Sequence, residues 1–209
     1  MSFDSAQQPR STDDKFAEKL GASPEVTLSD DSAVDKLAAK VTRASKRSGD
    51  KRHHITDGDF ALVEELTTAL REPSANQALV DASGLFAERL EDANFHSACR
   101  RIDAAAGEAL HRMNPDAQVH NPSAVMQASE NMELVRRAAD EYNARLTETY
   151  ISNGNTPEAA ESMARERTDN NLVYNPKLDE SLARELHGRV TGWRRDELLA
   201  NPSLPAGLR

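Results

Sequence analysis

The sequence is poor in several residue types on which common protein classes depend. Cys99 is its single cysteine, so no disulfide can form within the chain. No run of about 18 apolar residues occurs, which argues against a membrane-spanning helix. The 10 valines and 3 isoleucines are few beside 31 alanines and 20 leucines, a composition that favours helices over a β-rich core. We therefore expect an all-α protein of the cytoplasm with no membrane partner.

Glycine is also scarce, at 9 of 209 residues, and most of the glycines are isolated. Neither G-x-x-x-x-G-K-[ST] nor G-x-G-x-x-G is present, so the sequence predicts no phosphate-cradling loop. The nucleophile elbow G-x-S-x-G and the zinc motif H-E-x-x-H are missing too. These absences favour a protein that is not an enzyme, and we expect no cofactor.

Charge is abundant and unevenly distributed. The chain has 35 acids and 26 bases, a net charge of −9. Acids dominate residues 1–35 and 55–92, whereas bases outnumber the single acid Asp50 over residues 36–54. The charge pattern, taken with the helical periodicity, predicts four parts, which are a disordered tail (1–28), a basic helix and linker (29–54), a helical bundle domain (55–200) and a C-terminal tail (201–209).

Apolar residues at helical spacing predict an antiparallel bundle of six or seven helices. Thr56 and Asp59 have the spacing of a capping box, and Ser74 is the expected N-cap of the following helix. The longest stripe is a near-heptad seam predicted to form one helix over 124–151. The last helix is predicted to run from Leu178 past Trp193.

The basic segment 43–54 has three interpretations. A solvated basic hinge is favoured, a nucleic-acid contact is the second, and a contact with an acidic protein surface is the third. Its candidate phosphate-binding residues are Arg43, Lys46, Arg47, Lys51 and Arg52.

Candidate partner-binding residues lie near both ends of the chain. Phe3, Phe16 and Leu20 are anchors if the N-terminal tail orders on a partner, although a solvated tail is the favoured interpretation. Trp193 is either a core residue, which is favoured, or an interface anchor.

Three groups of residues have spacings seen at chemical sites. His53-His54-x-x-Asp57-x-Asp59 could bind a metal, but acids at a helix start already interact with the helix dipole. Glu108-x-x-His111 has the spacing used by di-iron bundles, which need a second such pair that this chain lacks. His96-x-x-Cys99 could place an imidazole and a thiol together on a helix, but Cys99 falls on an apolar stripe and is expected to be a buried, inert thiol. We therefore predict no metal site.

Three arginine doublets stand beside apolar stripe positions, and they are expected to pair with nearby acids such as Asp103, Asp140 and Asp196. A shared anion site is the alternative. The doublets are Arg100-Arg101, Arg136-Arg137 and Arg194-Arg195.

The N-terminal residues 3–28 resemble a leader found on assorted small proteins of actinobacteria, their phages and their plasmids. The resemblance rests on Phe3-Asp4, Gln8-Pro9-Arg10, Lys15-Phe16-Ala17-Glu18-Lys19 and Ser23-Pro24-Glu25-Val26-Thr27-Leu28. Asp14-Lys15 stands where that leader commonly has a glycine. Such leaders precede unrelated bodies, so the resemblance implies provenance and no activity.

Two functions follow as hypotheses. The first is a non-enzymatic helical interaction protein of a phage or mobile element, which binds a protein partner or itself through amphipathic helices, above all 124–151. The alternative is a nucleic-acid-binding accessory factor that uses the basic segment 43–54.

Overall fold

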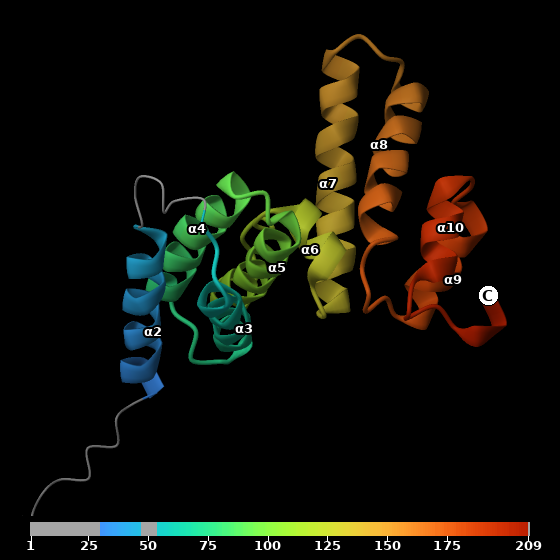
Figure 1. Ribbon diagram of the computed structural model, residues 1–209. Coiled ribbons are helices and arrows are strands. Elements are labelled where there is room, and N and C mark those ends of the chain that lie inside the picture. Colours follow the sequence, from blue (N-terminus) through green and yellow to red (C-terminus); the bar gives the residue numbers. More distant parts are fainter. Residues whose placement is uncertain (1–29, 47–53, 209) are drawn as a thin grey trace, which may run out of the picture.

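The computed structural model describes residues 30–46 and 54–208, with side chains from residue 33 (Figure 1). Within these ranges the protein is entirely helical, with nine α-helices and no strand, which confirms the predicted all-α class. The helices are α2 (Asp30–Ser45), α3 (Asp57–Arg71), α4 (Gln77–Asp92), α5 (His96–Met113), α6 (Pro122–Ala128), α7 (Met132–Ser152), α8 (Pro157–Leu172), α9 (Glu180–Arg189) and α10 (Trp193–Ala200). A short 3-10 helix, η3 (Ala206–Leu208), follows α10.

The described residues hold more helices than the predicted six or seven, because two stripes are each divided. The predicted helix 124–151 breaks after Ala128, and Asn131 caps a new helix by accepting from Leu134 N at 3.1 Å. The last predicted helix breaks at residues 190–192, where Gly192 has φ +58°. Side-chain periodicity continues through both breaks, so the stripes alone did not reveal them.

Helix starts follow the chemistry of short polar side chains. The capping box is confirmed, since Thr56 N donates to Asp59 Oδ2 at 2.9 Å and Asp59 N donates to Thr56 Oγ1 at 3.4 Å. The prediction that Ser74 caps the next helix is wrong. Asn76 is the N-cap there and accepts from Leu79 N at 3.0 Å.

The first core lies between helices α2 to α5 and is defined by the buried apolar residues of 34–109. Phe86, Leu66 and Ile102 are fully enclosed in it. The apolar face of α2 belongs to this core as well, so the basic helix is packed into the body. Leu85 on α4 lies outside this core and is 48% exposed.

The second core lies among α6 to α10 and is defined by the buried apolar residues of 119–204. Two buried asparagines tie its segments together. Asn175 Nδ2 donates to the carbonyl oxygens of Met126 and Ser129, at 2.9 and 3.0 Å. Asn201 Nδ2 donates to the carbonyl oxygens of Val173 and Asn175, at 3.0 and 2.7 Å. We call these two side chains the asparagine clasp.

The two cores meet where α5 packs on α6. Gly107 makes the approach close, because a Cβ there would lie 2.7 Å from Val125 Cγ2. Next to it, the buried Glu108 accepts from Ser129 Oγ at 2.6 Å and from Arg71 Nε at 3.3 Å. Glu108 therefore joins α3 and α5 to the break between α6 and α7.

Candidate partner-binding site

Helices α7 and α8 form an antiparallel hairpin whose outer end projects beyond the neighbouring helices (Figure 1). The inner part of α7 buries Leu134, Val135 and Ala138. From residue 139 to residue 159 no residue is buried, and we call this stretch the outer hairpin. The near-heptad seam of α7 is thus buried only in the first part of the helix.

The apolar residues of the outer hairpin are only partly covered. Tyr142, Leu146 and Tyr150 of the predicted seam are half-buried, and Ile151 at the end of α7 is 44% exposed. On the facing helix the buried side chains of this region are the small ones of Ala160 and Ala164. Because alanine buries little area, the hairpin contact alone leaves the larger side chains of α7 accessible.

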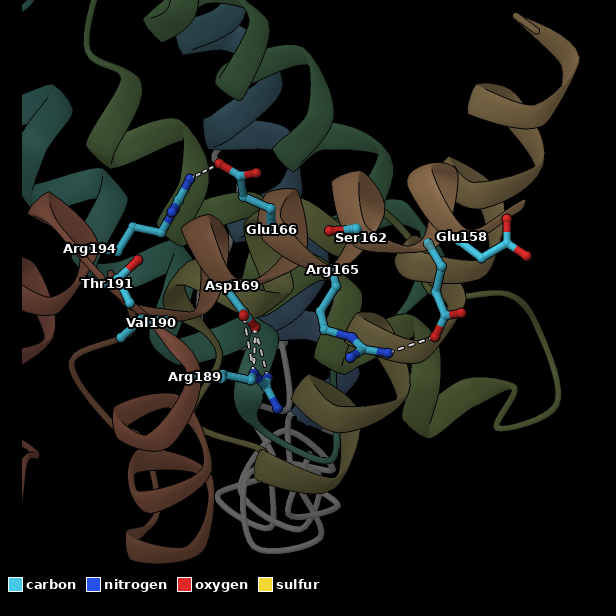
Figure 2. A pocket seen from close by; sticks show the side chains of 10 residues that line it. Glu158, Ser162, Arg165, Glu166, Asp169, Arg189, Val190, Thr191 and Arg194 are labelled. Carbon is cyan, nitrogen blue, oxygen red and sulfur yellow. Dashed lines mark hydrogen bonds and ion pairs between the residues drawn. The ribbon is translucent and has the colours of Figure 1, made fainter. Parts of the chain in front are cut away.

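A cleft of about 690 Å³ lies beside α8, between this helix and the turn from α9 to α10 (Figure 2). We call it the hairpin cleft. Three ion pairs cross it or line it. Its lining residues are Glu158, Glu161, Ser162, Arg165, Glu166, Asp169, Arg189, Val190, Thr191 and Arg194.

The arginines of the hairpin cleft are already paired with its acids. Arg189 holds the buried Asp169 through Nη2 at 2.7 Å and Nε at 3.0 Å. Arg165 pairs with Glu161 at 2.6 Å, and Arg194 pairs with Glu166 (Figure 2). A free anion would have to displace a carboxylate, so the cleft suits a partner that brings charges of both signs.

Trp193 lies next to this cleft and is 50% exposed, so the favoured prediction of a core tryptophan is wrong. The break at Gly192 places Trp193 in the first turn of α10 instead of on the buried face of α9. Arg194, which lines the cleft, lies over the indole ring with its Cζ 5.3 Å from the ring centroid. This leaves an aromatic surface of the kind that is frequent at interface hot spots.

The arginine doublets do pair with acids, though not with the three named as examples, Asp103, Asp140 and Asp196. Arg137 pairs with a nearby acid of its own helix, Glu141, at 2.8 Å, whereas the other ion pairs reach different segments. Arg101 pairs with Glu64 on α3, Arg136 with Asp179 and Glu185, and Arg194 with Glu166. Hydrogen bonds from Leu182 N and from Arg136 lower the pKa of Asp179. The three doublets do not converge on one anion site within the described residues.

The predicted nucleic-acid residues are only partly described. Arg43 and Lys46 are exposed at the end of α2, where Arg43 Nε donates to Ala39 O at 3.2 Å. Arg47, Lys51 and Arg52 lie outside the described residues, as do Phe3, Phe16 and Leu20 with the whole of the predicted N-terminal tail, 1–28.

Asp59, one of the acids near His54 that were candidates for a metal site, has a structural role. Burial alone would raise the pKa of Asp59, but hydrogen bonds from Arg89 and Thr56 lower it well below its usual range. Arg89 was not anticipated, although it occupies the apolar stripe three residues after Phe86. Its guanidinium binds Asp59 at 2.9 Å and donates to the carbonyls of Ala44 and His54, at 3.3 and 3.0 Å.

Two other chemical candidates are also structural. Cys99 is buried as predicted, and burial, helped by the negative charges of Asp103 and Glu91, raises the pKa of its thiol to about 11. Glu108 is engaged in the joint between the cores, whereas His111 lies 3.5 Å from Arg137. Within the described ranges no three His, Cys, Asp or Glu side chains are grouped to hold a metal ion.

No helix in the part of the chain that the structure describes is long and apolar enough to cross a membrane. No protein-family model, curated protein or solved structure matches this chain. The leader resemblance at residues 3–28 therefore stays a prediction.

Proposed function

We propose that this chain is a non-enzymatic interaction protein that binds a protein partner through the outer hairpin. One observation carries the proposal, namely that residues 139–159 contain apolar side chains at helical spacing and yet no buried residue. The partner is either another protein or a second copy of this chain.

The physical argument concerns helix stability. Short helices are marginal in water, and most of their stability in proteins comes from packing an apolar face against other elements. At its base the outer hairpin is anchored by Ala139 and Tyr142, which pack against the second core, and by Glu141, which accepts from Val119 N at 2.8 Å. Toward the tip the apolar packing is that of α7 on α8, where the buried side chains of α8 nearest the tip are those of Ala160 and Ala164. A partner that covers Leu146, Ile151 and Met163 would supply the missing apolar contact.

The hairpin cleft and Trp193 extend the proposed surface from the tip toward α10. The cleft offers carboxylates and guanidiniums that are partly exposed, and such groups give specificity and orientation more than affinity. Trp193 would be the anchor, since buried aromatic residues dominate binding energy at interfaces.

The proposed setting is the cytoplasm of a bacterium that hosts a phage or carries a mobile element. Support for it comes from the leader-like residues 3–28 alone. The mixed, acidic composition of the chain agrees with a cytoplasmic protein.

The test uses the full chain and a double variant, Ile151→Glu with Met163→Glu. Light scattering at two concentrations measures self-association, and capture from host lysate followed by mass spectrometry measures binding to other proteins. Leu85→Glu is the matched control, because Leu85 is equally exposed but lies on α4.

We expect an assembly or a captured protein that the double variant loses and the control keeps. A strict monomer that captures nothing, or a partner that both variants retain, contradicts the proposal. Amide hydrogen exchange of residues 139–159 should slow in the complex, because a covered hairpin opens less often.

Nucleic-acid binding through 43–54 is a second candidate, which the exposure of Arg43 and Lys46 at the end of α2 supports. Its test is the salt dependence of DNA and RNA binding by wild type and by a variant with alanine at 43, 46, 47, 51 and 52. No binding at about 50 mM salt contradicts it.

A further inference from the structure

A second cleft, of about 620 Å³, lies where the two cores meet, and it differs from the hairpin cleft in charge. We call it the arginine cleft. Three segments form its walls, the start of α5, the end of α6 and the link between α8 and α9. It is lined by Ser97, Arg100, Arg101, Gln127, Ala128, Tyr174 and Pro176.

The lining of the arginine cleft contains two bases and no acid, in a chain whose net charge is −9. Arg101 is held by Glu64 from outside the lining, at 2.7 and 2.6 Å, and this hydrogen bonding raises the pKa of Arg101. Arg100 is exposed and forms no ion pair with any residue in the described ranges. Its guanidinium is therefore available to an anion.

Tyr174 supplies an exposed aromatic surface in the same cleft. Its side chain is 48% exposed, while its neighbours Val173 and Asn175 are buried. The asparagine clasp binds the carbonyl oxygens of both neighbours through Asn201. The backbone on each side of Tyr174 is thus held in place, which reduces the entropy lost when a ligand packs on the ring.

A cleft with a free guanidinium and an exposed phenol ring on a held backbone fits a ligand that is planar at one end and anionic at the other. Its volume is in the range of small-molecule sites, roughly 300–1,000 Å³. Bases stack on aromatic side chains without regard to sequence, and arginine pairs with phosphate through two hydrogen bonds. A nucleotide unit has both features.

We propose that the arginine cleft binds a nucleotide, with its phosphate on Arg100 and its base against the ring of Tyr174. The nucleotide is free or part of a single strand, since both present the same groups. This site uses none of the residues of the outer hairpin or of the segment 43–54. The proposal can therefore be tested independently of both functions proposed above.

The experiment measures binding of a fluorescein-labelled dT12 strand to the full chain by anisotropy at 50 mM salt, with AMP as competitor. The variants are Arg100→Ala and Tyr174→Ala. Their matched controls are Arg167→Ala, another exposed arginine without an ion pair among the described residues, and Phe60→Ala, another exposed aromatic. Circular dichroism checks that each variant is folded.

We expect each cleft variant to weaken binding about tenfold or more, and each control to leave the affinity unchanged. Arg100→Ala should also reduce the slope of log K against log salt by about 0.7. Competition by AMP identifies a free-nucleotide site, and binding of the strand without competition identifies a single-strand site.

Three results would overturn the proposal. They are no binding of either probe at 50 mM salt, equal binding by wild type and both cleft variants, and displacement of the strand by a poly-glutamate peptide as readily as by unlabelled dT12. The last result would assign the cleft to acidic peptides.

Discussion

The two cores stabilise their buried polar groups in different ways. Inside the first core an ionised pair, Asp59 and Arg89, is almost fully buried, with side chains 1% and 2% exposed. Inside the second core the neutral amides of Asn175 and Asn201 bind backbone carbonyls. A buried charge requires its partner at all times, whereas a neutral amide loses less when a bond breaks.

The difference between a buried ion pair and buried amides agrees with the different roles of the two cores in the molecule. The α2–α5 core has its helix ends fixed by Arg89, which contacts α2, α3 and His54, three residues before α3. The α6–α10 core carries the uncovered outer hairpin and places most of its ion pairs at the surface. We infer that the first core is the rigid support and that the second presents the proposed protein-binding surface.

The largest expected effect is from Arg89→Leu, which leaves the Asp59 carboxylate buried without its cation. We expect a loss of about 3–5 kcal/mol in the free energy of unfolding, measured by urea denaturation. Arg101→Leu is the control, because it breaks an exposed pair with Glu64 and should cost at most about 1 kcal/mol. Equal losses would remove the distinction between buried and surface pairs.

The same pair predicts the acid dependence of stability. The pKa of Asp59 is lower in the folded chain than in the unfolded chain, so its contribution is fully present above the ordinary range near 3.9. This contribution is lost as the pH falls below that range toward the folded pKa. Urea midpoints measured from pH 6 to pH 2 should fall more steeply for wild type than for Asp59→Asn.

A smaller effect is expected from Asn201→Ala, which removes donors to two carbonyls and the acceptor for Ser203 N. We expect a loss of about 2–3 kcal/mol in the free energy of unfolding, since orphaned buried polar groups cost about 1–3 kcal/mol. Asn153→Ala, at the exposed end of α7, should change it by less than about 0.5 kcal/mol. If Asn201→Ala lost as much free energy of unfolding as Arg89→Leu, the neutral amides and the buried ion pair would not differ in the way proposed.

At alkaline pH the first core should weaken through Cys99. The pKa of its thiol is about 11 in the folded chain against an ordinary value of 9.0, so the folded state keeps a proton that the unfolded state releases. Stability therefore falls as the pH rises through this window, by roughly 2–3 kcal/mol in total. Cys99→Ala should show a shallower decline in thermal midpoint between pH 8.5 and 10.5.

The smallest expected effect concerns Ile151 in the outer hairpin and Met163, which follows it on α8. Ile151→Gln and Met163→Gln should each change the free energy of unfolding by less than about 0.5 kcal/mol, because both side chains are exposed. Leu134→Ala, in the buried part of α7, should cost about 2–5 kcal/mol. Equal costs at the two ends of α7 would show that the hairpin is covered in the free protein.

Local patterns predicted the helical segments and the capping box of α3. Thr56 with Asp59 marks that helix start because the groups involved lie within three residues of one another. The breaks at 129–131 and 190–192 were missed, since buried residues stand on both sides of each. Two residues could have indicated the breaks. Asn131 is a residue type that caps helices, and Gly192 is the residue type that most readily adopts a positive φ.

The contacts that define the candidate sites join residues far apart in the chain, and no spacing reveals them. Arg189 reaches Asp169 across 20 residues, and Asn175 reaches Met126 across 49. The exposed side of Trp193 depends on the break before it. The arginine cleft combines three segments whose meeting is a property of the packed chain.

The asparagine clasp also has a consequence for the order in which the chain folds. The first core is complete once Ala109 has been synthesised, so it can form while the rest of the chain is still on the ribosome. The second core needs Asn201 to hold Val173 and Asn175, and Leu204 to fill its last position. The backbone at residues 173–175, which positions Tyr174, is therefore among the last parts to form, after the first core.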